Sequence, residues 1–435
     1  MRIGFIQATS DVDVHWWPSL AFGYLKAYLE KHLDRSVTMD RIGRQEMTNC
    51  DIVGISSTTQ DYPIAKQIAA EAKKANSKVI TIIGGSHITY LPETLTPEFD
   101  FGVIGEGEQT LLELVQHIIS KGNARDLPDL VKIKGLIINW GRGNFFSDPR
   151  ELIVPIDNIP FPFREPAHAP HLMTSRGCPY KCTFCSSSAF WKKARFHSAE
   201  YVVNEIERLV CMGATSIPIQ DDLFIADKKR FQQITDLLIE RKLNKRFISS
   251  INIRANLVDE WLLGVLNRFP IQEVHFGAES GSNRILQLMG KGVTVAKNQA
   301  AIDMITNQGI KVVCSFIVGW PTETEEELRS TYEFLINNIK MGKLDQSCSM
   351  NILSPMPGTK VWQDAIKDGI IDLDDLDFRR LGIFASYRTS NAKSFDNWAD
   401  IRRQNNSIYL NENTVPQERL YQIMGEYEDV ILGKR

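Results

Sequence analysis

The sequence predicts an α/β protein in which strands alternate with helices in two separate regions. Over residues 1–147, short apolar runs alternate with helical patterns, which favours an N-terminal doubly wound (Rossmann-like) parallel sheet. A second alternation over residues 171–365 is typical of a βα barrel or part of one. Residues 366–435 carry helical segments and several tyrosines, and they predict a small, mainly helical C-terminal region.

The N-terminal region begins with the strand pattern "MRIGFIQA", followed by an amphipathic helical pattern that starts near Pro18. Further apolar runs, such as "CDIVGISS" and "KVITIIGG", end in small and polar residues. Ligands of doubly wound sheets bind beyond the carboxyl ends of the strands. No G-x-G-x-x-G fingerprint is present, so we expect neither NAD nor FAD there.

The segment 148–170 is rich in proline and has no helical period, so it is interpreted as an extended linker between two domains. Its aromatic residues Phe161 and Phe163 are expected to pack on one of the domains. The linker is therefore predicted to be fixed in place rather than freely moving.

Polar residues follow successive strand patterns of the second region. The segment "SAEYVVNEIERLVCMG" is a helix with Ser198 as its N-cap, and the strand patterns after it end in "QDD", "NIRAN", "GAESGS" and "VGWPTET". In βα barrels, the carboxyl ends of the strands carry the chemistry. Candidate site residues at these ends are Asp221, Asp222, Arg254, Glu279, Ser280 and Gly319.

Three of the seven cysteines lie in "TSRGCPYKCTFCSSSAFW", at positions 178, 182 and 185. The others are isolated, and no second C-x-x-C completes a zinc site. Cys211 and Cys314 lie in helical and apolar patterns and are predicted to be buried in the core. Thiolates are the usual ligands of iron–sulfur clusters, and three thiolates on a four-iron cluster leave one iron open for chemistry.

The C-x3-C-x2-C spacing, with the aromatic Phe184 just before the third cysteine, resembles the radical S-adenosylmethionine (SAM) superfamily. The resemblance implies a partial (β/α)6 radical SAM barrel whose 4Fe-4S cluster is held by Cys178, Cys182 and Cys185. It also implies that SAM binds the open iron and is cleaved to a 5′-deoxyadenosyl radical. On this resemblance, the SAM-binding residues are Phe184, Asp221, Asp222, Arg254, Glu279, Ser280 and Gly319.

The phrases "PSLAFGYLKAYL", "GGSHITYLPE" and "GEGEQTLLEL" resemble the cobalamin-binding-like domain that precedes the radical domain in one branch of this superfamily. The D-x-H-x-x-G pattern that supplies a cobalt ligand elsewhere is missing, although Asp13 and His15 occur. His87 is interpreted as a capping or surface histidine. Either cobalamin binds, or the domain is a scaffold only. If cobalamin binds, the candidate residues are Ser56, Ser57, Thr58, Gly84, Gly85, Gly105 and Glu106.

Missing cysteines separate the subclasses of this superfamily. A methylthiotransferase acting on transfer RNA needs three more cluster cysteines in the N-terminal domain, where only Cys50 occurs. Auxiliary clusters would need a cysteine-rich tail, which is absent.

Residues 366–435 are expected to form a helical cap over the barrel mouth. Its aromatic residues Phe384, Tyr387 and Trp398 either line a pocket or pack in a core.

The favoured function is a cobalamin-dependent C-methyltransferase that acts on a small molecule. The alternative is a cobalamin-independent dehydratase, epimerase or rearrangement enzyme, and a distant alternative is an iron–sulfur redox sensor. A flavodoxin or ferredoxin type protein is the expected electron donor.

The composition predicts an ordinary globular protein. The net charge of −3 gives no electrostatic reason to expect a nucleic-acid partner. No signal-peptide pattern and no run of about 18 apolar residues occurs, and seven mostly scattered cysteines argue against a disulfide framework. We therefore expect a cytoplasmic protein without a membrane span.

Overall fold

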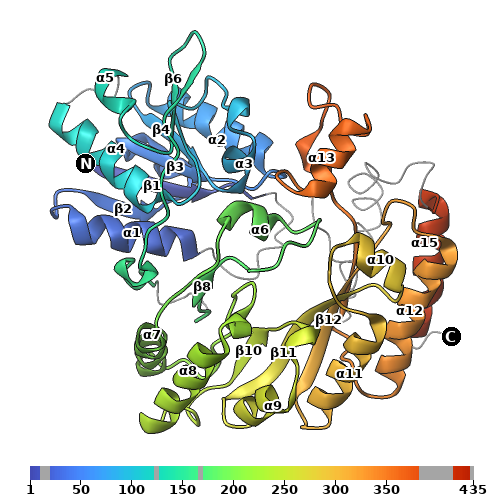
Figure 1. Cartoon of the computed structure of the whole chain (residues 1–435). Helices are drawn as coiled ribbons and strands as arrows, with labels where there is room; N and C mark the ends of the chain where they lie inside the picture. Colours follow the sequence, from blue (N-terminus) through green and yellow to red (C-terminus); the bar gives the residue numbers. More distant parts are fainter. Residues whose placement is uncertain (10–19, 122–126, 165–169, 382–414, 432–435) are drawn as a thin grey trace. The chain divides into compact units, whose positions relative to one another are not determined.

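The computed structural model describes residues 1–9, 20–121, 127–164, 170–381 and 415–431. The chain divides into two compact units, Met1–Ala169 and Pro170–Arg435, shown in the ribbon of Figure 1. The division falls at the end of the proline-rich segment that the sequence analysis interprets as a linker. Each unit is described by itself below.

The first unit contains a seven-stranded sheet with the order β2-β1-β3-β4-β5-β6-β7. Strands β2 to β5 run parallel, whereas β6 and β7 add an antiparallel hairpin at one edge. The order reverses between β1 and β3, which is the topological switch point at which such sheets bind ligands. The bounds are β1 Arg2–Gln7, β2 Thr38–Arg41, β3 Ile52–Ser56, β4 Ile80–Gly84, β5 Phe101–Val103, β6 Leu136–Asn139 and β7 Asn144–Phe146.

Amphipathic helices pack against this sheet because their apolar residues recur at helical spacing. In α2, for example, Ala65, Ile68, Ala69 and Ala72 are buried while the lysines of its last turn are not. Helices α1 and α4 bury their own stripes against the other strands. The bounds are α1 Leu20–His32, α2 Tyr62–Ala75, α3 Ser86–Tyr90, α4 Gly107–Lys121 and α5 Leu127–Leu130.

The described part of the proline-rich segment is fixed to helix α1. The backbone N–H of Phe163 donates to the carbonyl of Gly23 at 2.9 Å, and the Phe163 ring meets Phe22 edge-on. The ammonium of Lys26 lies over the Phe163 ring, 4.7 Å from its centroid. A side chain at Gly23 would collide with the Phe163 carbonyl at 2.4 Å. Phe163 therefore packs on the first unit, as expected.

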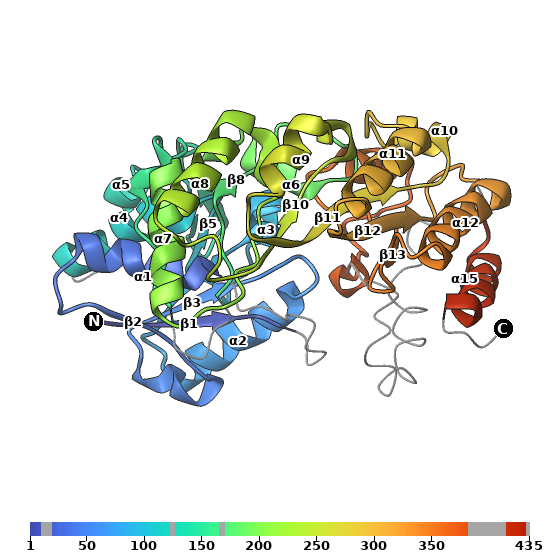
Figure 2. The ribbon, with the colours of Figure 1, turned by 90° about the horizontal axis from the view of Figure 1, so that it is seen from below.

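The second unit contains a parallel sheet with the order β10-β11-β12-β13. Two further extended segments continue it, through the parallel bridges Leu172–Ile219 and Ser216–Ile248. Six parallel segments therefore lie side by side, which confirms the predicted partial barrel. Helices cover one side of this curved sheet (Figures 1 and 2). The bounds are β10 Ser249–Asn252, β11 Ile271–Glu279, β12 Lys311–Val318, β13 Ser349–Ile352, α7 Ala199–Cys211, α8 Lys228–Glu240, α9 Glu260–Leu266, α10 Asn283–Leu288, α11 Val295–Thr306, α12 Glu325–Lys340 and α13 Lys360–Lys367.

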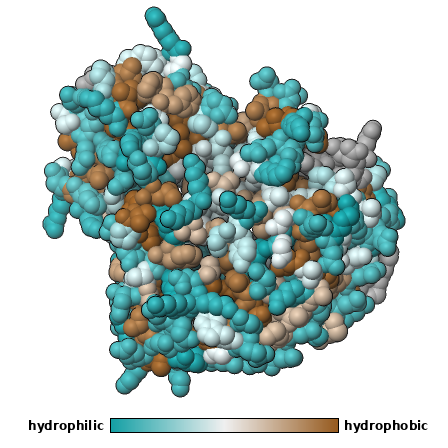
Figure 3. Space-filling model, viewed as in Figure 1, coloured by the Kyte–Doolittle hydropathy of each residue, from teal (hydrophilic) through white to brown (hydrophobic). Residues whose placement is uncertain are grey.

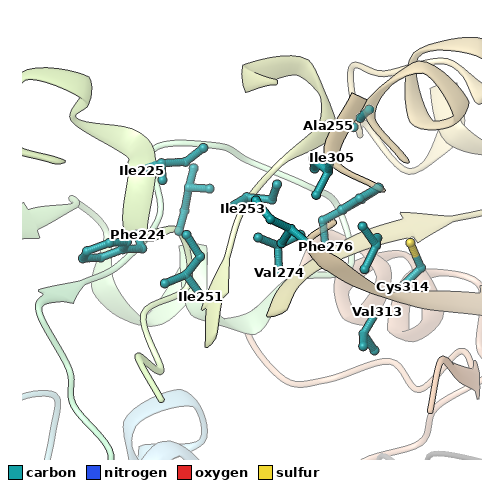
Figure 4. Packing of buried hydrophobic residues seen from close by; sticks show 14 of the residues in the cluster. Phe224, Ile225, Ile251, Ile253, Ala255, Val274, Phe276, Ile305, Val313 and Cys314 are labelled. Atoms are coloured by element: carbon teal, nitrogen blue, oxygen red, sulfur yellow. The ribbon is translucent and has the colours of Figure 1, made fainter. Parts of the chain in front are cut away.

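The core of this unit lies between the sheet and its helices. Figure 4 shows Phe276, Val274 and Cys314 among the apolar side chains that fill it. Cys314 is buried, as predicted, but the prediction for Cys211 is wrong because this residue is exposed. Cys211 is the last residue of α7, next to Leu209 and Val210 of the buried stripe. Each residue turns the helix by about 100°, so the side chain of Cys211 leaves the buried face and points outward.

Helix α15 (Gln417–Ile431) in the C-terminal region packs along barrel helix α12. The rings of Tyr332 and Tyr427 stack with their centroids 4.6 Å apart. Arg419 on α15 reaches Glu325 on α12 with an N–O distance of 2.6 Å. The aromatic residues Phe384, Tyr387 and Trp398 lie outside the described residues.

None of the described helices combines the length and the apolar composition needed to cross a bilayer. The face of the molecule in Figure 3 is largely hydrophilic, with hydrophobic side chains in scattered patches.

Candidate cluster and cofactor sites

The three clustered cysteines lie on one loop between β8 (Ser175–Arg176) and the short helix α6 (Ser186–Trp191). All three are free, partly buried thiols. Burial raises the pKa of Cys178 and of Cys185, so without a bound metal both favour the neutral thiol. Gly177, which opens the loop, has a φ of 92°, and a side chain there would meet Trp191 Cβ at 2.7 Å. Only glycine fits this turn without strain.

Arg254 places a buried positive charge against this loop. Its Nη1 lies 3.5 Å from Cys182 Sγ, and its guanidinium carbon lies 3.9 Å from the ring centroid of Tyr180. Its Nε is buried without a hydrogen-bond partner among the described residues. Three thiols are suitable ligands for an anionic iron–sulfur cluster. A guanidinium with a hydrogen-bond donor to spare is suited to bind the carboxylate of a ligand on that cluster.

The two adjacent acids at the end of the second barrel segment have different environments. The carboxylate of Asp221 is fully buried and accepts hydrogen bonds from the backbone N–H and hydroxyl groups of Thr174 and Ser175. Burial raises the pKa of Asp221. Asp222 accepts a hydrogen bond from the Ser187 hydroxyl at 2.5 Å. Asp221 thus joins two barrel segments, which leaves Asp222 as the acid better placed to bind a ligand.

Glu279 ends β11 in a left-handed conformation, with a φ of 63°, where the register to β12 shifts. Such a conformation is costly for a residue with a side chain, and it is typical of functional sites. The Glu279 carboxylate accepts a hydrogen bond from the Lys291 ammonium at 2.6 Å. The next residue, Ser280, is buried, and its hydroxyl lies 3.2 Å from that of Thr331. The sequence analysis missed Lys291, although "MGKGVT", with glycine on either side of the lysine, was a usable signal.

The loop after β12 is fixed by Glu323, a second residue that the sequence analysis missed. Its Oε2 accepts hydrogen bonds from the backbone N–H groups of Gly319, at 2.6 Å, and Trp320, at 3.2 Å. Burial raises the pKa of Glu323 to about 7, and its Oε1 is buried without a partner among the described residues. The ring of Phe184 from the cysteine loop meets Trp320 edge-on, with centroids 6.1 Å apart. Two predicted site segments therefore meet here.

Among the described residues, no three His, Cys, Asp or Glu side chains close around a point that would hold a single metal ion. The three cysteines are instead spaced along one loop, and corner ligation of a four-iron cluster uses three separate sulfur atoms.

In the first unit, the candidate cobalamin residues lie at the last residue of β3 or β4 or just after β3, β4 or β5, at the carboxyl edge of the sheet. A Cβ atom added at Gly84 or Gly105 would meet no atom within 4 Å, so open space lies beside both positions. Gly85, with a φ of 106°, lets its loop approach the Ser57 carbonyl, and the Ser57 N–H donates to the Gly84 carbonyl at 3.0 Å. Ligands of doubly wound sheets bind at this edge, and glycine lets a ligand approach the backbone closely. The remaining candidates are Ser56, Thr58 and Glu106.

His87 is a core residue, so its interpretation as a surface histidine is wrong. Its ring stacks on Tyr62 with centroids 3.8 Å apart, and its Nε2 lies 2.9 Å from the Thr94 hydroxyl. Burial lowers the pKa of His87 to about 3, so the ring is neutral. Asp13 and His15 lie outside the described residues.

Comparison with known proteins identifies both units. Residues 172–335 match the model of the radical SAM superfamily, and residues 10–115 match the model of the B12 binding domain. An uncharacterised methyltransferase of Pyrococcus horikoshii is 35% identical over 337 residues, which cover 74% of this chain and 70% of that protein. The chain belongs to the radical SAM superfamily. The resemblance that the cysteine spacing and the strand-end phrases indicated is thereby confirmed.

Other relatives of this radical SAM enzyme carry different names. The anaerobic magnesium-protoporphyrin IX monomethyl ester cyclase of Rubrivivax gelatinosus is 29% identical, over 77% of this chain and 65% of that protein. The chain thus spans 65% to 70% of the length of these two curated relatives. A solved structure of the cobalamin-dependent SAM radical enzyme OxsB has a TM-score of 0.73 at 18% identity, covering 99% of this chain and 72% of that one. It shares the fold.

Proposed function

We propose that this radical SAM enzyme is a cobalamin-dependent C-methyltransferase that acts on a small molecule. The observation that carries the proposal is the joint presence of a three-cysteine loop beside a buried arginine and a B12 binding domain with an open carboxyl edge. The Pyrococcus horikoshii relative, which is named a methyltransferase, supports the reaction type.

In this proposal, Cys178, Cys182 and Cys185 hold a 4Fe-4S cluster. When bound, the cluster and SAM supply a 5′-deoxyadenosyl radical, and cobalamin supplies the methyl-transfer chemistry. The protein's own residues bind and orient these groups within a barrel that limits access of water.

The SAM-binding residues surround the cysteine loop. The guanidinium of Arg254 and the hydroxyl of Ser280 bind the carboxylate of SAM, and Asp222 accepts hydrogen bonds from its amine. Glu279, with Lys291 as its partner, binds the ribose side of the ligand, and Phe184 and Gly319 lie beside the adenine. Asp221 does not contact SAM in this proposal, because its carboxylate already accepts hydrogen bonds from Thr174 and Ser175. It positions the barrel segments that carry the site.

Cobalamin binds along the carboxyl edge of the first unit. The space beside Gly84 and Gly105 accepts the corrin, and Ser56, Ser57, Thr58, Gly85 and Glu106 line the same edge. His87 is not a cobalt ligand in this proposal, because its ring is already packed on Tyr62 and bonded to Thr94.

The second candidate is a radical transformation without methyl transfer. The Rubrivivax gelatinosus relative supports it, since that protein is named a cyclase. A third candidate is an iron–sulfur redox sensor, which would need no substrate cradle around the strand ends.

A flavodoxin or ferredoxin type protein donates the electron in this proposal, and the exposed Lys181 within the cysteine loop suits an acidic partner. Reversing this charge with Lys181→Glu should weaken flavodoxin binding, measured as a Kd, while Lys245→Glu at the opposite edge of the barrel sheet serves as a control. Equal Kd values would remove Lys181 from the docking surface.

We also propose a cytoplasmic location, which the seven free thiols support.

The decisive experiment is anaerobic incubation of reconstituted protein with SAM and titanium(III) citrate. Formation of 5′-deoxyadenosine supports the radical enzyme, and its absence with an intact cluster favours the sensor. Corrin absorption that survives desalting supports methyl transfer, whereas its absence favours the second candidate. The Cys182→Ala variant should lose cluster iron and all 5′-deoxyadenosine, and retained product would contradict the cluster assignment.

A further inference from the structure

Thr183, in the middle of the cysteine loop, bonds to two other parts of the barrel through its backbone. Its N–H donates to the carbonyl of Met289 at 3.0 Å, and its carbonyl accepts from the N–H of Val361 at 3.2 Å. Its hydroxyl also lies 3.4 Å from the carbonyl of Leu288. The segment between Cys182 and Phe184 is therefore held from both sides.

On one side, the bond reaches the loop that follows α10. Met289 is fully buried, and its own N–H donates to Ile285, so its carbonyl is held in place by the end of a helix. Two residues further on, Lys291 forms the ion pair with Glu279. The cysteine loop is thereby joined to the end of strand β11.

On the other side, the bond reaches the first turn of α13, which follows the last barrel strand. The first N–H groups of a helix have no acceptor within the helix, so Val361 can donate outward. The helix start is itself fixed, because the hydroxyl of the buried Thr359 accepts from the Trp362 N–H at 3.1 Å. The buried side chains of Val361 and Trp362 anchor the helix.

We propose that Thr183, Met289 and Val361 form a clasp that fixes the cysteine loop, with Thr183 as its positioning residue. The clasp determines how slowly the cluster leaves the protein, because a ligand loop must open before iron can be removed. This inference rests on the proposed cluster site and goes beyond the three cysteines themselves. One hydrogen bond of ordinary strength corresponds to about a five- to tenfold change in such an opening equilibrium.

The first test uses Val361→Pro, which removes the donated N–H and retains a residue that the first helical turn accepts. Val361→Ala is the matched control, since it shortens the same side chain and keeps the N–H. The measurement is the rate at which the reconstituted cluster releases iron to an anaerobic chelator, together with the iron content at the start and the unfolding temperature. We expect Val361→Pro to release iron about five to ten times faster than Val361→Ala, with equal starting iron.

A second pair covers the case in which Val361→Pro does not fold. Thr183→Pro removes the N–H bonded to Met289, and Thr183→Val keeps it while losing only the hydroxyl. Thr183→Pro should release iron about five to ten times faster than Thr183→Val, with a changed electron paramagnetic resonance line shape of the reduced cluster. Equal rates within the folded pairs would overturn the clasp. A wild-type protein that takes up no cluster would instead overturn the proposed function.

Discussion

Glu279 and Lys291 form an ion pair within the barrel, with Lys291 Nζ 2.6 Å from Glu279 Oε1 and both side chains buried. A buried charge that loses its partner is costly, by about 3 to 5 kcal/mol. The pair connects the left-handed end of β11 to the loop after α10, so it supports both the SAM site and the clasp.

The first prediction concerns this pair. Lys291→Met leaves the Glu279 carboxylate unpaired and should lower the free energy of unfolding by about 3 to 5 kcal/mol, measured by urea denaturation. The double variant Glu279→Gln with Lys291→Met removes both charges and should recover most of that loss. Its affinity for SAM, measured by calorimetry, should nevertheless stay below that of the wild type. Wild-type SAM affinity in the double variant would show that the pair is structural only.

The second prediction concerns Arg254. Arg254→Ala should raise the Kd for SAM by about 10- to 100-fold, because a hydrogen bond to a charged group contributes about 1.5 to 3 kcal/mol. The iron content should stay at the wild-type level, since the three cysteines remain. Arg254→Lys keeps the charge but loses the planar fork, so an intermediate Kd is expected. An unchanged Kd in Arg254→Ala would exclude Arg254 from SAM binding.

The third prediction tests the cobalamin edge. A Cβ atom added at Gly84 would meet no protein atom within 4 Å, so Gly84→Leu makes no clash at the start of its side chain and should fold. It should nevertheless fill the space proposed for the corrin and weaken hydroxocobalamin binding by tenfold or more, measured by absorbance titration. Gly425→Leu on α15 is the control, because that position is equally open. If both variants bind cobalamin like the wild type, the ligand lies elsewhere.

The fourth prediction follows from the buried carboxyl of Glu323, whose pKa of about 7 in the folded protein exceeds its usual 4.5. The folded state therefore binds this proton more tightly than the unfolded state, so its contribution to stability is largest below pH 4.5 and falls as pH rises through 7. Relative to Glu323→Gln, the free energy of unfolding of the wild type should fall by up to about 3 kcal/mol as the pH rises from below 4.5 to above 7. The measurement is denaturant unfolding of both proteins at several pH values. A stability difference that does not vary with pH would contradict the assignment.

The local features of the chain were readable from its sequence. Periodicity predicted strands and helices, as in the buried stripe of α7. The N-cap prediction for Ser198 is confirmed, because its hydroxyl accepts a hydrogen bond from the Tyr201 N–H at 3.1 Å. The three cysteines were readable because ligands on one loop keep a fixed spacing. The family resemblance supplied the predicted cofactors, and the family models that match both units confirm this resemblance.

Features that depend on distant contacts were misjudged or missed. Cys211 seemed a core residue and His87 a surface residue, because their burial depends on where a helix ends and what packs against it. Lys291 and Glu323 were missed, since their partners are visible only when the strand ends are brought together. Asp221 and Asp222 are adjacent in sequence, yet only one of them has its carboxylate bonded to Thr174 and Ser175.

The sequence by itself determined the two α/β regions, the cysteine loop and the chemistry that three thiolates make available. Only the tertiary structure decided which side chains surround that loop, because residues separated by about 70 to 180 positions, such as Arg254, Met289 and Val361, reach it through folding of the barrel. The physical reason is that metal ligation follows local spacing, whereas burial and hydrogen bonding are properties of surfaces that exist only once the strands are side by side.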